Sequence, residues 1–186
     1  MHSRYVLQPH AANPPTEGIQ IDAAAAALPG GDLRLEYRLR GPLERLRLPP
    51  PAPPRATDGL WRHTCFEAFV GTADGAAYRE FNFSPSGCWA AYGFSDARRR
   101  DAFAASGDCP VAARTGADTL LVTATIPAAW LPAWGEWQVG LSAVVEMTDG
   151  RLGYWALHHP PGAPDLHAAD GRRLIVARAS DPEVRQ

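Results

Sequence analysis

The chain has 186 residues, of which 46% are hydrophobic and 20% charged, the composition of an ordinary globular protein. Its net charge is −2 and its basic residues are all arginine. We therefore expect no nucleic-acid surface and no lysine Schiff base. No apolar run is long enough to span a membrane and no signal-peptide pattern opens the chain, so we expect a cytoplasmic protein without a membrane partner. We expect residues 1–186 to form one domain.

The first third of the chain alternates apolar and polar residues. Segments 4–10 and 18–24 are expected strands, and 33–41, "LRLEYRLRG", is the strongest of them because its apolar side alternates with a solvated arginine-rich side. Segment 43–49 is expected to pair with that strand through the Gly41-Pro42 turn. The proline-rich run at 49–54 cannot be a central strand and is expected to be an extended linker.

From residue 60 onward, turn residues separate further expected strands. We predict these strands over residues 60–70, 78–85, 88–95, 109–115, 119–127, 137–147, 152–160 and 172–179. Asp149-Gly150 predicts a hairpin. Residues 96–106 are expected to form a short helix, 127–134 a helical turn, and 160–171 a long polar loop. About ten strands with one or two short helices predict an all-β fold, an antiparallel β-sandwich of jelly-roll type.

The segment "LWRHTCFEAFV", residues 60–70, raises the question of function. On one side of this expected strand stand Trp61, His63, Cys65 and Glu67, which are an indole, an imidazole, a thiol and a carboxylate. Three interpretations are open: a metal site, a thiol catalyst, or a polar cleft with an aromatic stacking surface.

The first two interpretations rest on His63 and Cys65. Their spacing suits metal ligation, with a further histidine such as His158 or His167 completing the site, but no second ligand pair at standard spacing follows. Cys65 with a histidine base would make a minimal catalytic dyad, although a cysteine in mid-strand is more typical of a buried thiol. We therefore expect the protein to bind no metal and no cofactor. The alternative is a cysteine- or metal-dependent enzyme.

The cleft interpretation fits more of the pattern. Tyr78, Glu80 and Asn82 share one side of the next strand, and Trp155 and His158 come from a late strand. Sugar rings have apolar C–H faces that stack on indole and hydroxyl groups that need carboxylate and amide partners. We therefore expect a non-enzymatic binding module for a saccharide or a related small polar metabolite.

The segments 60–71, 78–95 and 150–176 resemble the DOMON-like proteins of bacteria, within the superfamily of family 9 carbohydrate-binding modules and DOMON domains. The resemblance implies an antiparallel β-sandwich and a sugar held between two tryptophans. On that pattern Trp61 and Glu67 match one tryptophan and a glutamate six residues on, Glu80 and Asn82 match polar contacts, and Trp155 is the candidate for the second tryptophan. Haem ligation and a protein-interaction module remain the further alternatives.

The pattern also predicts positions. The turn at 71–76 makes residues 60–70 and 78–85 hairpin partners, which brings Glu67 and Glu80 together. We expect both to be partly buried, on the same face as Trp61, and close to a histidine or arginine. His63 and His158 are the nearest candidates.

Overall fold

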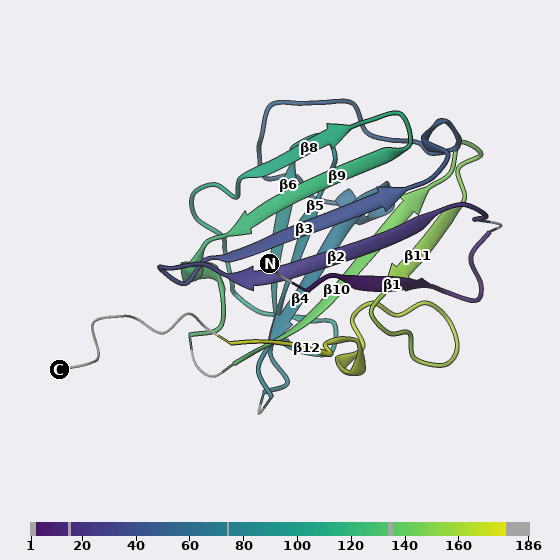
Figure 1. The fold of residues 1–186 in the computed structure, drawn as a ribbon. Coiled ribbons are helices and arrows are strands. Elements are labelled where there is room, and N and C mark those ends of the chain that lie inside the picture. Colours follow the sequence, from purple (N-terminus) through teal and green to yellow (C-terminus); the bar gives the residue numbers. More distant parts are fainter. Residues whose placement is uncertain (1–2, 15, 74, 134–135, 178–186) are drawn as a thin grey trace.

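The protein, described as a computed structural model over residues 3–14, 16–73, 75–133 and 136–177, is all-β (Figure 1). Its described strands are β1 (Tyr5–Pro9), β2 (Gln20–Ala27), β3 (Leu33–Arg40), β4 (Cys65–Gly71), β5 (Tyr78–Phe83), β6 (Trp89–Asp96), β7 (Arg99–Arg100), β8 (Val111–Thr115), β9 (Thr119–Ile126), β10 (Trp137–Glu146), β11 (Leu152–Ala156) and β12 (Leu174–Val176). Their pairings are antiparallel throughout, and the predicted fold class is confirmed.

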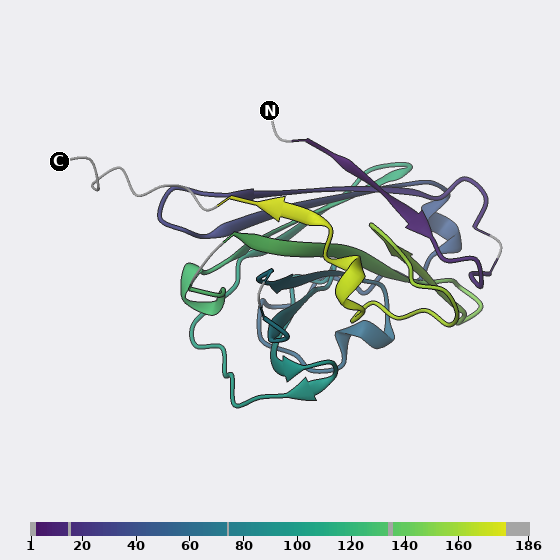
Figure 2. The ribbon, with the colours of Figure 1, turned by 90° about the horizontal axis from the view of Figure 1, so that it is seen from below.

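The strands form two packed layers, which Figure 2 shows edge-on. One layer has the order β1-β2-β3-β9-β8 and the other β7-β6-β5-β4-β10-β11, with β12 beside the start of β10. The strand β1 joins them, because Tyr5 to Leu7 pair with β2 while Gln8 and Pro9 pair with β11. We call these layers the β3 sheet and the β4 sheet.

Side-chain alternation explains the core between the layers. Leu33, Leu35, Tyr37 and Leu39 point inward from β3, and Phe66, Ala68 and Val70 meet them from β4. The Tyr37 hydroxyl crosses the core and donates to the backbone carbonyl of Glu67 at 2.7 Å. A buried hydroxyl needs such a partner, so this bond fixes the two sheets against each other.

The two sheets differ on their outer faces. Residues of β3 alternate between buried and solvated, whereas every residue of β4 is buried. The outer side of β4 is therefore covered, and the segment 157–173 together with the turn before β4 supplies that cover.

Several predicted elements are wrong in detail. Residues 96–106 contain no helix, because Asp96 and Arg99 pair across a two-residue turn that joins β6 to β7. Segment 43–49 is not a strand paired with β3. It starts with a 3-10 turn at Leu43–Arg45, and Leu46 bridges Met147 instead. The helical segments of the described chain are 3-10 turns of three residues, and none of them has the length to cross a membrane.

Candidate functional site

A cavity of about 340 Å³ lies on the outer face of the β4 sheet. Strands β4, β5, β10 and β11 form its floor, the β6–β7 hairpin forms one side, and the segment 157–173 forms another. The lining residues are Trp61, Glu67, Phe69, Glu80, Phe94, Arg98, Arg100, Val144, Leu152, Tyr154, Pro164, Leu166 and His167. Aromatic rings and charged groups therefore share one concave surface, the composition typical of a small-molecule site.

Trp61 borders this cavity from a 3-10 turn at Leu60–Arg62 and not from the predicted strand, which begins at Cys65. Gly59 starts the turn with φ of +77°, a conformation that favours glycine. Its N–H donates to the Tyr92 hydroxyl at 3.4 Å, and that hydroxyl donates in turn to Asp58. Trp61 is 44% exposed, and the Arg62 guanidinium lies 5.0 Å from the centre of its indole ring.

Glu67 is 3% exposed on the cavity floor. Its two carboxyl oxygens accept from the Cys65 thiol at 3.5 Å and the Ser142 hydroxyl at 3.3 Å, and in the described chain no arginine or histidine pairs with it. Burial, and then the nearby charge of Glu80, raise the pKa of Glu67 to about 8. At neutral pH this side chain is mainly a carboxylic acid that can donate a hydrogen bond.

Glu80 and Asn82 extend the polar floor along β5. Glu67 is the cross-strand neighbour of Asn82, and Asn82 donates through Nδ2 to Glu80 Oε1 at 2.8 Å. Burial raises the pKa of Glu80 above its ordinary value, against the bond from Asn82 and the charges of Arg100 and Arg98. Asn82 is fully buried, and its Oδ1 has no hydrogen-bond partner in the described part of the chain.

His167 links the covering segment to the floor. Its ring lies among Phe69, Tyr78 and Phe94, and this burial lowers its pKa to about 4, so it is neutral at physiological pH. The Tyr78 oxygen accepts from the Arg98 N–H at 3.1 Å and lies 2.8 Å from His167 Nδ1. His167 Nε2 lies 3.6 Å from Glu80 Oε2.

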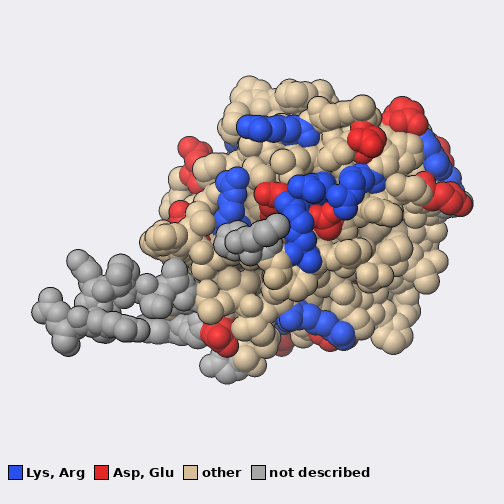
Figure 3. Space-filling view, viewed as in Figure 1, with Lys and Arg blue, Asp and Glu red and all other residues tan. Residues whose placement is uncertain are grey.

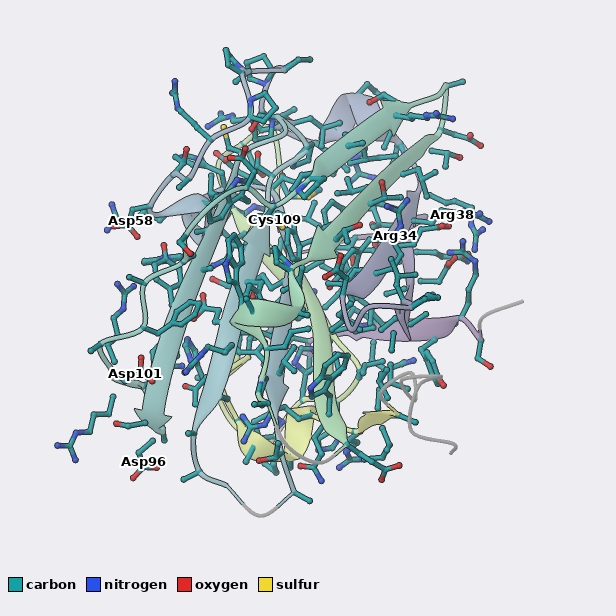
Figure 4. All side chains as sticks on the ribbon, turned by 90° about the vertical axis from the view of Figure 1, so that its left-hand side faces the viewer. Arg34, Arg38, Asp58, Asp96, Asp101 and Cys109 are labelled. Carbon is teal, nitrogen blue, oxygen red and sulfur yellow. The ribbon has the colours of Figure 1, made fainter. Side chains whose placement is uncertain are left out.

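Two arginines stand on the hairpin side of the cavity. Arg98 adopts a left-handed φ of +54° and pairs with Asp165 of the covering segment at 2.6 Å. Such backbone conformations in residues other than glycine concentrate at functional sites. The Arg100 guanidinium lies 4.1 Å from the centre of the Tyr92 ring. Figure 4 shows this side of the molecule, with Asp58, Asp96 and Asp101 labelled along it.

The structure brings five of the eight predicted site residues into one neighbourhood. Trp61, Glu67 and Glu80 line the cavity, while Asn82 and Tyr78 support it from below. The expectation that Glu67 and Glu80 are buried on the face that Trp61 borders is confirmed, and the expected histidine lies near Glu80 but not, among the described residues, near Glu67. The expected identity of that histidine was wrong, because it is His167.

The other three predicted residues lie elsewhere. Trp155 is 1% exposed in the core between the sheets, because β11 turns Gly153 and Trp155 inward and Leu152 and Tyr154 outward. His63 Nδ1 is 2.8 Å from Glu146 Oε2, and His158 Nε2 is 3.4 Å from Asp170. Neither histidine lines the cavity.

Sequence reasoning missed Tyr154, Arg98, Arg100 and His167 as lining residues. Strict alternation along β11 could have separated Tyr154 from Trp155. The arginines were hidden by the wrongly predicted helix. No local pattern marks His167, because a long loop carries it back over the sheet.

The groups required by the two enzyme interpretations are apart. Cys65 is fully buried, burial raises the pKa of its thiol well above the ordinary value, and it contacts Glu67 and no histidine within the described residues. Among those residues no three His, Cys, Asp or Glu side chains are grouped to hold a metal ion.

Comparisons with known proteins give the fold. No protein-family model matches the chain, and no curated protein matches it in sequence. The solved structures that it resembles include a candidate carbohydrate-binding protein from Bacteroides uniformis, with a TM-score of 0.65, 14% identity, and coverage of 95% of this chain and 87% of that one. They also include a family 9 carbohydrate-binding module from Caldicellulosiruptor kristjanssonii in complex with cellotriose (TM-score 0.62, 10% identity, 98% and 86% covered) and one in complex with glucose (0.59, 10%, 94% and 86%). The chain therefore has the fold of carbohydrate-binding proteins.

Proposed function

We propose that this chain is a non-enzymatic saccharide-binding module whose ligand occupies the cavity on the β4 sheet. The observation that carries the proposal is the exposed indole of Trp61 bordering a cavity whose floor holds the buried carboxyl groups of Glu67 and Glu80. An apolar sugar face would stack on the indole while the hydroxyl groups bond to the floor.

The lining groups suit a polyhydroxylated ligand because they both donate and accept. Glu67, protonated at neutral pH, can donate, Glu80 can accept, and Arg98 and Arg100 present guanidinium donors. Tyr154 supplies a second aromatic surface from the strand in which Trp155 had been expected to do so. The neighbours of known structure support this interpretation, since the family 9 modules among them hold cellotriose or glucose. We further propose that the chain belongs to the wider DOMON-like superfamily.

The test is binding of the full chain to a panel of mono- and oligosaccharides by calorimetry or thermal shift. A ligand present at 100 times its dissociation constant should stabilise the folded state by about 2.7 kcal/mol. Trp61→Ala should abolish binding with an unchanged circular dichroism spectrum, because the indole is exposed. Tyr5→Ala is the matched control, since Tyr5 is an exposed aromatic residue on β1 and does not line the cavity. The proposal fails if no saccharide binds or if Trp61→Ala binds normally.

A further inference from the structure

The cavity floor holds more hydrogen-bond acceptors than donors. Glu67 and Glu80 line it with carboxyl oxygens, and beneath it the buried Asn82 Oδ1, which does not line the cavity, has no partner among the described residues. The donors that reach these oxygens are the Cys65 thiol, the Ser142 hydroxyl and Asn82 Nδ2. Buried acceptors without donors are costly, so a donor-rich ligand group would be stabilised here.

The three acceptors are neighbours on two adjacent strands. Asn82 is directly opposite Glu67 in the β4–β5 register, and its amide nitrogen is engaged by Glu80. Its oxygen lies beneath the floor and adds to the acceptor-rich surroundings of the two carboxyl groups, which line the cavity. An ammonium group has three N–H donors and no acceptor, which matches the carboxyl oxygens of Glu67 and Glu80.

Positive charge of the protein does not already compensate Glu67. Arg98 pairs with Asp165, and Arg100 stacks over Tyr92 on the hairpin side. The charges of both arginines lower the pKa of Glu80, whereas the groups that shift the pKa of Glu67 are Glu80, Cys65 and Ser142. His167 is neutral and faces Glu80. Within the described residues, the floor around Glu67 is thus the part that lacks a cationic partner.

We propose that the saccharide carries a protonated amino group, which Glu67 receives together with Glu80 on the cavity floor. Trp61 borders the same cavity, but the Arg62 guanidinium already lies 5.0 Å from the centre of its indole ring, so the carboxyl groups and not the indole receive the ammonium. The inference rests on the proposed function and names its ligand class, an amino sugar.

Binding of this class has a proton signature. At about pH 6.5, below the pKa of Glu67 of about 8, the free protein holds a carboxylic acid. When the ammonium group binds, the carboxyl O–H bond breaks, its proton passes to the buffer, and an ammonium N–H donates to the carboxylate that remains. Binding of a neutral sugar should release no proton, because it brings no positive charge to the carboxyl group.

The experiment is calorimetric titration of the full chain with matched sets of hexoses in two buffers of different ionisation enthalpy. Each set holds one amino sugar (glucosamine, galactosamine or mannosamine), its neutral parent and its N-acetyl derivative. In the set whose stereochemistry fits, we expect the amino sugar to bind at least about tenfold more tightly than both neutral forms and to release protons.

Glu67→Gln keeps the shape of the side chain and should remove both the tenfold preference and the proton release. Glu36→Gln, which removes one carboxylate from β3 of the other sheet, should keep both. If Glu67→Gln does not fold, the presence or absence of proton release by the wild type still tests the inference.

Equal binding of amino and neutral sugars, or binding without proton release, overturns the inference and leaves the proposed function standing. A preference that survives in Glu67→Gln also overturns it. If no sugar of any set binds, the proposed function fails and the inference fails with it.

Discussion

Two buried acidic side chains on the outer faces of the sheets, Asp22 on β2 and Glu67 on β4, differ in how their charge is compensated. On β2, Asp22 is 6% exposed and lies between Arg4 and Arg40, whose guanidinium nitrogens are 2.8 and 2.7 Å from its carboxylate. Figure 3 shows arginine and acidic side chains gathered over β2 and β3. On β4, Glu67 is buried as deeply and has no cationic partner among the described residues.

The difference lies in what covers each acid. Asp22 is covered by the stems of its own partners, so burial and pairing come together. Glu67 lies beneath the turn that carries Trp61 and the segment 157–173, and among the described residues neither supplies it with a cationic partner. A buried acid without such a partner is costly unless a proton or a ligand neutralises it. The contrast marks the cavity floor around Glu67 as the place where a ligand would relieve that cost.

The largest effect we predict tests which residues of β11 face that cavity. Trp155→Ala should lower the free energy of unfolding by about 3–5 kcal/mol, because Trp155 fills the core between the sheets. Tyr154→Ala, one position away and outward, should cost clearly less. Urea unfolding followed by circular dichroism measures both. Equal losses of unfolding free energy would mean that Trp155 and Tyr154 do not point to opposite faces of β11. The assignment of residues to the cavity face would then be wrong.

The next largest effect is a pH dependence of the free energy of unfolding that Glu67 causes. The pKa of Glu67 is about 8 when folded and about 4.3 when unfolded, so the folded state binds the extra proton and stability falls as pH rises between these values. His167 acts in the opposite direction, because its folded pKa of about 4 lies below its unfolded value of about 6.5. Its contribution rises with pH up to about 6.5 and is then complete.

The window between about pH 6.5 and 8 is therefore the clean one for Glu67. Across it, wild type should lose roughly 2 kcal/mol relative to Glu67→Gln, because one pH unit of differential proton binding corresponds to about 1.4 kcal/mol. Urea midpoints of the two proteins, measured at several pH values, give the difference directly. Parallel pH profiles would show that Glu67 is ionised at neutral pH, which would remove the contrast between the faces.

A smaller effect should appear on the opposite face. Asp22→Asn removes the shared carboxylate of Arg4 and Arg40 and should cost about 1 kcal/mol, since both arginines are partly exposed and solvent screens the pairs. Glu67→Gln at about pH 6.5 should cost less than about 0.5 kcal/mol, because it replaces one neutral group by another of similar shape. If Glu67→Gln cost more than Asp22→Asn in a denaturant titration, Glu67 would be the acid with the stronger charge partner, contrary to the description above.

The sequence predicted the sheets better than the site. Alternation along 33–41 and 78–85 gave the right strands and the right inward residues, because a strand with one face in a core has a strict period of two. The same rule placed Glu67, Glu80 and Asn82 on one face. It failed at Trp61, where a glycine-initiated turn replaces the expected strand, and at 96–106, where arginine-rich polarity resembled a solvated helix.

The rest of the site depends on contacts between distant parts of the chain. His167 reaches Tyr78 across 89 positions, and Arg98 reaches Asp165 across 67. No periodicity within a window of local sequence encodes such pairs. The segment 157–173 was recognised as a loop, but its return over the β4 sheet is a property of the folded chain.

The smallest effect concerns how the turn that carries Trp61 is held beside the cavity. The Tyr92 hydroxyl accepts from the Gly59 N–H and donates to Asp58, so it fixes both residues that precede the turn. Tyr92→Phe removes this anchor but keeps the ring under Arg100. We expect the affinity for the saccharide that binds wild type to fall about two- to fivefold, equivalent to about 0.5–1 kcal/mol for one hydrogen bond. Tyr5→Phe is the matched control, because Tyr5 does not line the cavity. Calorimetry on both variants measures the change. A loss as complete as that of Trp61→Ala would make Tyr92 a ligand contact itself, and an unchanged affinity would mean that the turn holds its shape through Gly59 alone.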